Sequence, residues 1–194
     1  MRITKGWLKK WEACPEGVKW FLSKKLQLKS DKQVMEELIA TEKLDWANWV
    51  LARLLKRKQQ IQYTIFAAEQ VIDIFEKQYP NDNRPRNAIE AAKIVLKRDT
   101  KKNRDAAAYA AAYAAYAAYA AIYAAYAADA ADATYAADAA YAATYAAYAA
   151  AYAAYAANAT DAATYAAADA SADASADAMK IRILNYGIKL LEAK

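Results

Sequence analysis

Two arginines, Arg84 and Arg86, flank Pro85 at the expected start of a helix that Asp82 or Asn83 can cap. Positive charge at a helix N-terminus is unfavourable by roughly a few tenths of a kcal/mol, so these side chains should have an anionic partner. That partner is either an aspartate from the alanine-rich region later in the chain or an external anion. The planar guanidinium group can hold a carboxylate or a phosphate at two points. We therefore take Asp82, Arg84 and Arg86 as candidate binding residues.

A second basic cluster contains Arg53, Lys56 and Arg57, near the end of another expected helix. Such a cluster is typical of a solvated helix end, where positive charge also suits the helix dipole. It is also a place where the chain could contact phosphate groups. We keep these three residues as candidate binding residues beside the arginine pair.

Residues that carry out catalysis or hold cofactors are scarce. The chain has no histidine, one cysteine (Cys14) and three glycines. These counts leave no Ser-His or Cys-His pair, no glycine-rich phosphate loop and no cluster of metal ligands. Asp82 and Glu90 could form an acid–base pair, but nothing in their spacing singles them out. We therefore expect a non-enzymatic protein that needs no metal and no cofactor.

Amphipathic helices must position the basic clusters. Apolar residues recur at helical spacing through the first hundred residues; the first helix is expected to start at Thr4, and Ser30 is expected to cap a later one. Pro15 suits the first turn of a helix, and Pro80 follows the end of a long one. Five tryptophans fall within the first 49 residues. We interpret them as core aromatics of short helices in preference to a binding site.

Residues 105–178 consist almost wholly of alanine and tyrosine and contain no lysine, arginine, glycine or proline. Alanine is the best helix former, and tyrosines three or four residues apart lie on one helix face. From Asp129 to Asp138 the marked positions step by three, which rotates the stripe away from one partner. We expect breaks near 128–134 and 157–162 and helices of about 20–28 residues. We interpret the tyrosines as filling space between close-packed alanine backbones; a stacking platform for bases is the alternative.

A short amphipathic segment closes the chain and shows one apolar face of isoleucines and leucines, with Gly187 as an expected weak point. The expected organisation is thus a basic helical domain (1–104), alanine- and tyrosine-rich helices packed on it (105–178) and a closing helix (179–194). The fold class expected from these patterns is an all-α multi-helix bundle.

Charge is distributed unevenly along the chain. Residues 1–104 carry a net charge of +10, residues 105–178 carry −8 and residues 179–194 carry +3. Attraction between the first two segments weakens any inference from basicity to nucleic acid. The N-terminus shows no apolar signal-peptide core, and aspartates recur too often in the alanine-rich region for a membrane helix. We expect a cytoplasmic protein with no membrane contact.

The segment Asp-x-Arg-Pro-Arg-x-Ala-Ile-Glu-Ala-Ala (residues 82–92) precedes an alanine-rich region with tyrosine every three or four residues. This combination resembles a family of bacterial and phage immunity proteins, small helical antitoxins of polymorphic toxin systems. The resemblance covers roughly residues 60–190. It implies a role in neutralising another protein and supplies no catalytic residues.

Two functions follow as expectations. The first is an inhibitor or immunity-type protein that binds and neutralises a protein partner, either a toxin or a host defence factor. The alternative is a nucleic-acid- or nucleotide-binding protein that uses the basic N-terminal region together with tryptophan and tyrosine faces. Salt separates the two, because a phosphate binder loses affinity steeply as salt rises.

Overall fold

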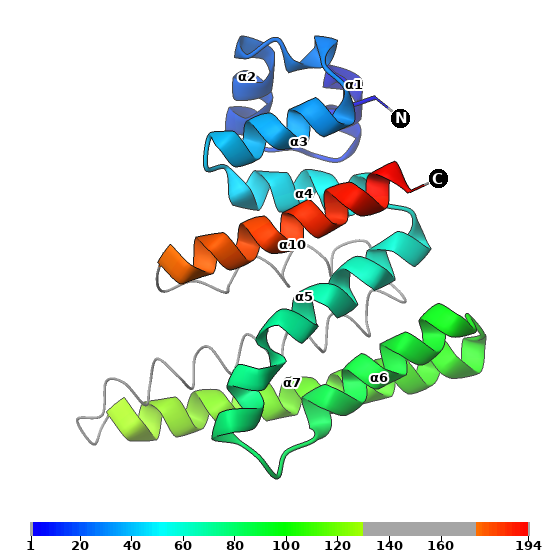
Figure 1. Cartoon of the computed structure of the whole chain (residues 1–194), viewed down its shortest axis with the longest axis vertical. Coiled ribbons are helices and arrows are strands. Elements are labelled where there is room, and N and C mark those ends of the chain that lie inside the picture. Colours follow the sequence, from blue (N-terminus) through cyan, green and yellow to red (C-terminus); the bar gives the residue numbers. More distant parts are fainter. Residues whose placement is uncertain (1, 130–173, 194) are drawn as a thin grey trace.

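The computed structural model of the chain describes residues 2–129 and 174–193. Helices account for 81% of them, and no strand occurs in these two ranges (Figure 1). The all-α class predicted from the sequence is therefore confirmed for the described residues. In chain order the helices are α1 (Lys5–Lys10), α2 (Pro15–Ser23), the 3-10 helix η1 (Leu26–Leu28), α3 (Asp31–Ala40), α4 (Leu44–Leu54), α5 (Arg57–Gln78), α6 (Arg84–Lys97), α7 (Lys101–Asp129) and α10 (Ala174–Glu192).

Local signals set where the short N-terminal helices begin. Oγ1 of Thr4 accepts a 3.1 Å hydrogen bond from the backbone N–H of Trp7 and caps α1. Ser30 and Gln33 form a capping box at the start of α3. Pro15 is the first residue of α2. These starts agree with the sequence prediction because each depends on one or two neighbouring residues.

The ends of α1 and α3 are sharp turns made without glycine. Glu12 and Glu42 follow these helices with φ angles of 53° and 56°, the left-handed conformation in which a helix commonly ends. After α3, the N–H of Lys43 bonds to the carbonyl of Leu38 at 2.9 Å and closes the turn. These turns reverse the chain within a few residues and bring α1 to α4 together.

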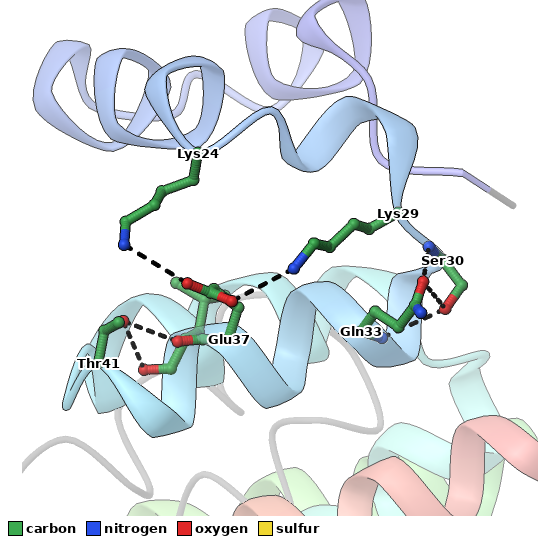
Figure 2. A network of polar contacts seen from close by, with 7 residues as sticks. Lys24, Lys29, Ser30, Gln33, Glu37 and Thr41 are labelled. Carbon is green, nitrogen blue, oxygen red and sulfur yellow. Dashed lines mark hydrogen bonds and ion pairs between the residues drawn. The ribbon is translucent and has the colours of Figure 1, made fainter.

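Glu37 of α3 ties the preceding elements to that helix. Its two carboxylate oxygens lie 3.6 Å from Nζ of Lys24, at the end of α2, and 3.3 Å from Nζ of Lys29, after η1 (Figure 2). Both lysines approach the glutamate from the same side of α3. The pairs are partly exposed, so each contributes at most about 1 kcal/mol, but together they fix α2 over α3.

Two hydrophobic cores share helix α5. One face of α5, which includes Ile65 and Phe75, packs with α6 and α7. Another face, which includes Tyr63 and Ala67, joins the core formed by α1 to α4. Helix α10 returns from the far end of the chain to complete this N-terminal core, lying alongside α4 and α5 in Figure 1.

Gly187 lies where α10 approaches α4 and α5 most closely. A Cβ atom here would overlap Cδ2 of Leu51 and lie only 2.8 Å from Cε2 of Tyr63. Both neighbours are fully buried, and the hydroxyl of Tyr63 donates a 2.7 Å hydrogen bond to Oδ1 of Asn48. The interpretation of Gly187 as a weak point is therefore wrong: the missing side chain is what permits this contact.

Helix α7 packs on α6 through alanine rather than tyrosine. Ala107, Ala111, Ala114 and Ala117 are buried in the shared core. Tyr109, Tyr113 and Tyr116 remain 65%, 44% and 62% exposed. For these three tyrosines the space-filling interpretation is wrong, because a methyl group lets two helix axes approach closely where a phenol ring would hold them apart. The chain breaks expected near 128–134 and 157–162 lie outside the described residues, apart from 128 and 129 at the end of α7.

Candidate partner-binding site

The five tryptophans of the N-terminal core form two groups of contacting rings, in which Trp7–Trp49 and Trp20–Trp46 meet edge to face and Trp7–Trp11 is tilted. Trp7 lies between Trp11 and Trp49, with ring centroids 6.3 Å and 5.9 Å away. Trp20 of α2 meets Trp46 of α4 with centroids 5.8 Å apart. Edge-to-face pairs of this kind contribute roughly 0.5–1.5 kcal/mol beyond their buried area. Trp7 is buried as expected of a core residue, whereas the other four rings remain half-exposed.

A cavity of about 350 Å³ opens between these helices. Trp20, Trp46 and Trp49 form part of its wall, and Phe21 and Leu38 belong to its apolar lining. The remaining lining residues are Ile3, Leu8, Glu12, Ala13, Cys14, Gly17, Val34, Asp45 and Val50. A mostly apolar wall with few polar groups is typical of a site that binds by burial of surface.

Two cations lie over tryptophan rings that line this cavity. Cζ of Arg53 is 4.0 Å from the centroid of Trp49, and Nζ of Lys43 is 4.6 Å from that of Trp46. Such contacts contribute roughly 0.5–1 kcal/mol at exposed sites. They place positive charge against two rings of the cavity wall. Asp45, at the edge of the cavity, lies 3.6 Å from Nζ of Lys180 of α10.

The three basic residues between positions 53 and 57 lie in different surroundings. Arg53 stacks on Trp49 and donates from Nη1 to the carbonyl of that residue at 3.1 Å. The backbone N–H of Lys56 bonds to Oε1 of Gln59 as α5 begins. Arg57 pairs with Asp99 at 3.0 Å. Of the three, Arg53 is therefore the one that contacts a tryptophan of the cavity wall.

Arg84 and Arg86 have internal carboxylate partners. Arg84 binds both oxygens of Asp82 at 2.9 Å and 2.6 Å, and Arg86 binds both oxygens of Glu76 at 2.7 Å and 2.6 Å. Hydrogen bonds from these guanidinium groups hold the pKa values of Asp82 and Glu76 below their usual range. The expectation of an aspartate from the alanine-rich region is corrected: the partners come from α5 and from the loop before α6.

The structure thus separates the predicted site residues into three places. Asp82, Arg84 and Arg86 form ion pairs at the start of α6. Arg53 stacks on Trp49 of the cavity wall, and Lys56 and Arg57 lie at the start of α5. The cavity itself was missed because the tryptophans were assigned to the core. Its signal in the sequence was the density of tryptophan on helices too short to bury every ring.

The N-terminal part of the chain is similar to a known family. Residues 1–58 match the family model of the YdhT N-terminal domain. This segment contains all five tryptophans and every residue that lines the cavity. No curated protein and no solved structure matches the chain.

Two further kinds of site were sought in the described ranges. None of the helices there is both long and apolar enough to cross a bilayer. Among the same residues, no three side chains of His, Cys, Asp or Glu type come together in a way that could hold a metal ion.

Proposed function

We propose that this chain is a non-enzymatic protein that binds and neutralises a protein partner, and that its tryptophan-lined cavity holds an apolar side chain of that partner. The observation that carries the proposal is the cavity of about 350 Å³ walled by Trp20, Trp46 and Trp49. Tryptophan and arginine are the residue types most enriched at the energetic centres of protein interfaces. Arg53, stacked on Trp49, places the second of these types against a residue of the wall.

The composition of the lining favours binding over catalysis. Of the residues that line the cavity, only Glu12 and Asp45 are carboxylates, and Asp45 lies beside Lys180. An apolar side chain that enters such a cavity loses its hydration and gains contacts on several sides, which is how a few anchors dominate an interface. The rigid tryptophan rings lose little conformational freedom when a partner binds.

The class of partner rests on the resemblance of residues 82–92 and the following alanine-rich region to immunity proteins. It makes the partner a toxin or a host defence factor that the protein meets in the cytoplasm. The internal pairing of Arg84 with Asp82 and of Arg86 with Glu76 argues for a structural role for those side chains. We therefore assign the partner contact to the cavity rather than to the arginine pair.

A cavity-filling substitution tests this proposal. Ala13 lines the cavity and is half-buried, so Ala13→Met places three further heavy atoms in or beside the space without removing a wall. Ala40→Met, at the exposed end of α3, is the matched control. Tagged wild type and both variants are used to capture proteins from host lysate, with and without nuclease. A nuclease-resistant partner held by the wild type and the control, and lost with Ala13→Met, is expected; equal capture by all three contradicts the assignment.

A second candidate function is nucleic-acid or nucleotide binding by the basic N-terminal region. Four of its lysines are exposed and form no ion pair with another described residue: Lys5, Lys9, Lys19 and Lys25. Affinity for a phosphate backbone would fall steeply between about 50 and 200 mM salt. The affinity of a shape-complementary apolar contact would change little over the same range of salt. A salt titration of the captured complex therefore separates the two candidate functions.

A further inference from the structure

A hollow of about 430 Å³ is lined by residues of α10 and by Phe66 of α5, and it shares no lining residue with the tryptophan-lined cavity. Its aromatic part is a stacked pair, Phe66 of α5 and Tyr186 of α10, with centroids 4.0 Å apart and ring planes at 14°. Its polar part comes from Arg182, Asn185 and Lys189 of α10. The pair is half-buried, so the rings are held in place and still reach the hollow.

The polar side chains of this hollow are exposed and available. Within the described ranges, no hydrogen bond or ion pair joins Arg182, Asn185 or Lys189 to another side chain. Burial raises the pKa of the Tyr186 phenol, and the negative charge of Glu69 raises it further. Glu69 is itself neutralised by Lys93 at 2.8 Å. The hollow therefore carries two positive charges that no described carboxylate pairs with, beside a stacked aromatic pair.

The helix spacing places one cation on each side of the ring. Arg182 precedes Tyr186 by four residues and Lys189 follows it by three, so all three lie on one face of α10. At 1.5 Å per residue the Cα atoms of the two basic residues lie about 6 Å and 4.5 Å along the axis from that of the tyrosine. Any planar group against the ring thus has a cation available in both directions along the helix.

We propose that this hollow binds single-stranded nucleic acid, with one base against the Phe66–Tyr186 pair and the phosphates on either side of it at Arg182 and Lys189. Base stacking on aromatic rings together with flanking cations is the general mode of sequence-tolerant single-strand binding. A nucleotide inside a strand has a phosphate on both sides, whereas a free mononucleotide has one. The two-sided placement of the cations therefore favours a strand. The site is distinct from the tryptophan-lined cavity and does not depend on the function proposed for it.

The test measures binding of a fluorescein-labelled poly(dT) strand of ten nucleotides by fluorescence anisotropy. The double variant Arg182→Gln/Lys189→Gln removes both flanking cations. The control Lys97→Gln/Lys102→Gln removes the same charge from exposed positions at the junction of α6 and α7. We expect the first variant to bind about tenfold or more weakly and to lower the salt slope by about 1.4, since each phosphate contact on a single strand contributes about 0.7. The control should change affinity by less than about threefold.

Two further arms identify the ligand. Tyr186→Ala should weaken strand binding roughly tenfold through lost stacking, and thymidine monophosphate should displace the strand only at much higher concentration. If Tyr186→Ala fails to fold, the glutamine variants still test the proposal, because the side chains that they replace are exposed. Absent strand binding, or equal loss in both glutamine variants, overturns the proposal. If the monophosphate displaces the strand at the same total concentration of nucleotide, the hollow binds a free nucleotide and not a strand. If no strand binds and the Arg182→Gln/Lys189→Gln variant instead fails to capture a protein that the wild type captures, this face binds a protein, and the proposal is likewise overturned.

Discussion

Substitution of Gly187 by alanine should destabilise the protein, although alanine normally stabilises a helix. In a helix interior, alanine is favoured over glycine by about 1 kcal/mol. The added methyl group would overlap Leu51 and crowd the ring of Tyr63, both fully buried. Overpacking of this kind costs roughly 1–3 kcal/mol, and movement of Tyr63 also weakens its bond to Asn48, by roughly a further 1 kcal/mol. The expected net loss in unfolding free energy is about 1–3 kcal/mol.

Urea denaturation followed by circular dichroism measures this loss. Gly6→Ala is the matched control, because a Cβ at Gly6 has its nearest neighbour, Oγ1 of Thr4, at an ordinary 3.8 Å. That variant should be neutral or slightly more stable. Combining Gly187→Ala with Leu51→Ala should be less damaging than the sum of the two, since the second change makes room for the first. A Gly187→Ala protein as stable as the wild type would refute the close-contact reasoning.

Three more outcomes follow from the described contacts. Glu42→Gly should raise the unfolding free energy by roughly 0.5–1 kcal/mol, because glycine adopts its left-handed conformation without strain; a lower urea midpoint would contradict this. Arg86→Ala should cost about 1 kcal/mol at pH 7, as the pair is partly exposed. The pKa of Glu76 is lowered in the folded protein, so the stability that its ion pair contributes is present above the ordinary pKa of about 4.5 and is lost as pH falls through the folded pKa. In thermal melts, the difference in stability between Arg86→Ala and the wild type should therefore be smaller at pH 3 than at pH 7. A difference that stays constant argues against the ion pair. Ala111→Leu should cost roughly 1–3 kcal/mol by forcing α6 and α7 apart, whereas Tyr113→Ala should cost much less; the reverse order in thermal melts would mean that α7 buries its tyrosine face.

The helix starts were predictable because each depends on local chemistry. Thr4 and Ser30 cap their helices through bonds to backbone groups three residues ahead, and this spacing is visible in the sequence. The pairing of Arg84 with Asp82 is also local, two residues apart. The long acidic region, with eight aspartates and no basic residue, is the more prominent negative charge in the sequence, and it suggested the wrong partner.

The buried face of α7 could not be decided from the sequence. Two sets of residues on α7 repeat at three- and four-residue steps: the alanines Ala107, Ala111 and Ala114, and the tyrosines beside them. Periodicity therefore identifies two stripes on the helix but does not tell which of them is buried. The choice depends on how closely α6 approaches, which is a tertiary property. The same holds for Gly187, whose role appears only once Leu51 and Tyr63 are placed against it.

The N-terminal core extends beyond the segment that matches the YdhT N-terminal domain, and this predicts that residues 1–58 do not fold alone. Tyr63 of α5 and Ile183, Leu184 and Ile188 of α10 are buried in that core. Each large apolar side chain contributes roughly 1.5–3 kcal/mol on burial, so removing three from α10 alone costs about 5–9 kcal/mol. That loss is comparable to the whole stability of a small domain.

We therefore expect a fragment of residues 1–58 to melt without a cooperative transition, with its tryptophans in a solvent-like environment. A longer fragment, residues 1–80, should regain a sharp transition when a peptide of residues 174–193 is added, because α10 then covers Leu51 and Tyr63 again. A peptide that carries Gly187→Ala should restore less of the cooperative transition. This difference would show that the recovery depends on the native contact and not on nonspecific apolar binding. Cooperative unfolding of residues 1–58 with native-like tryptophan fluorescence would show instead that the cavity unit is complete before α5 and α10 are added.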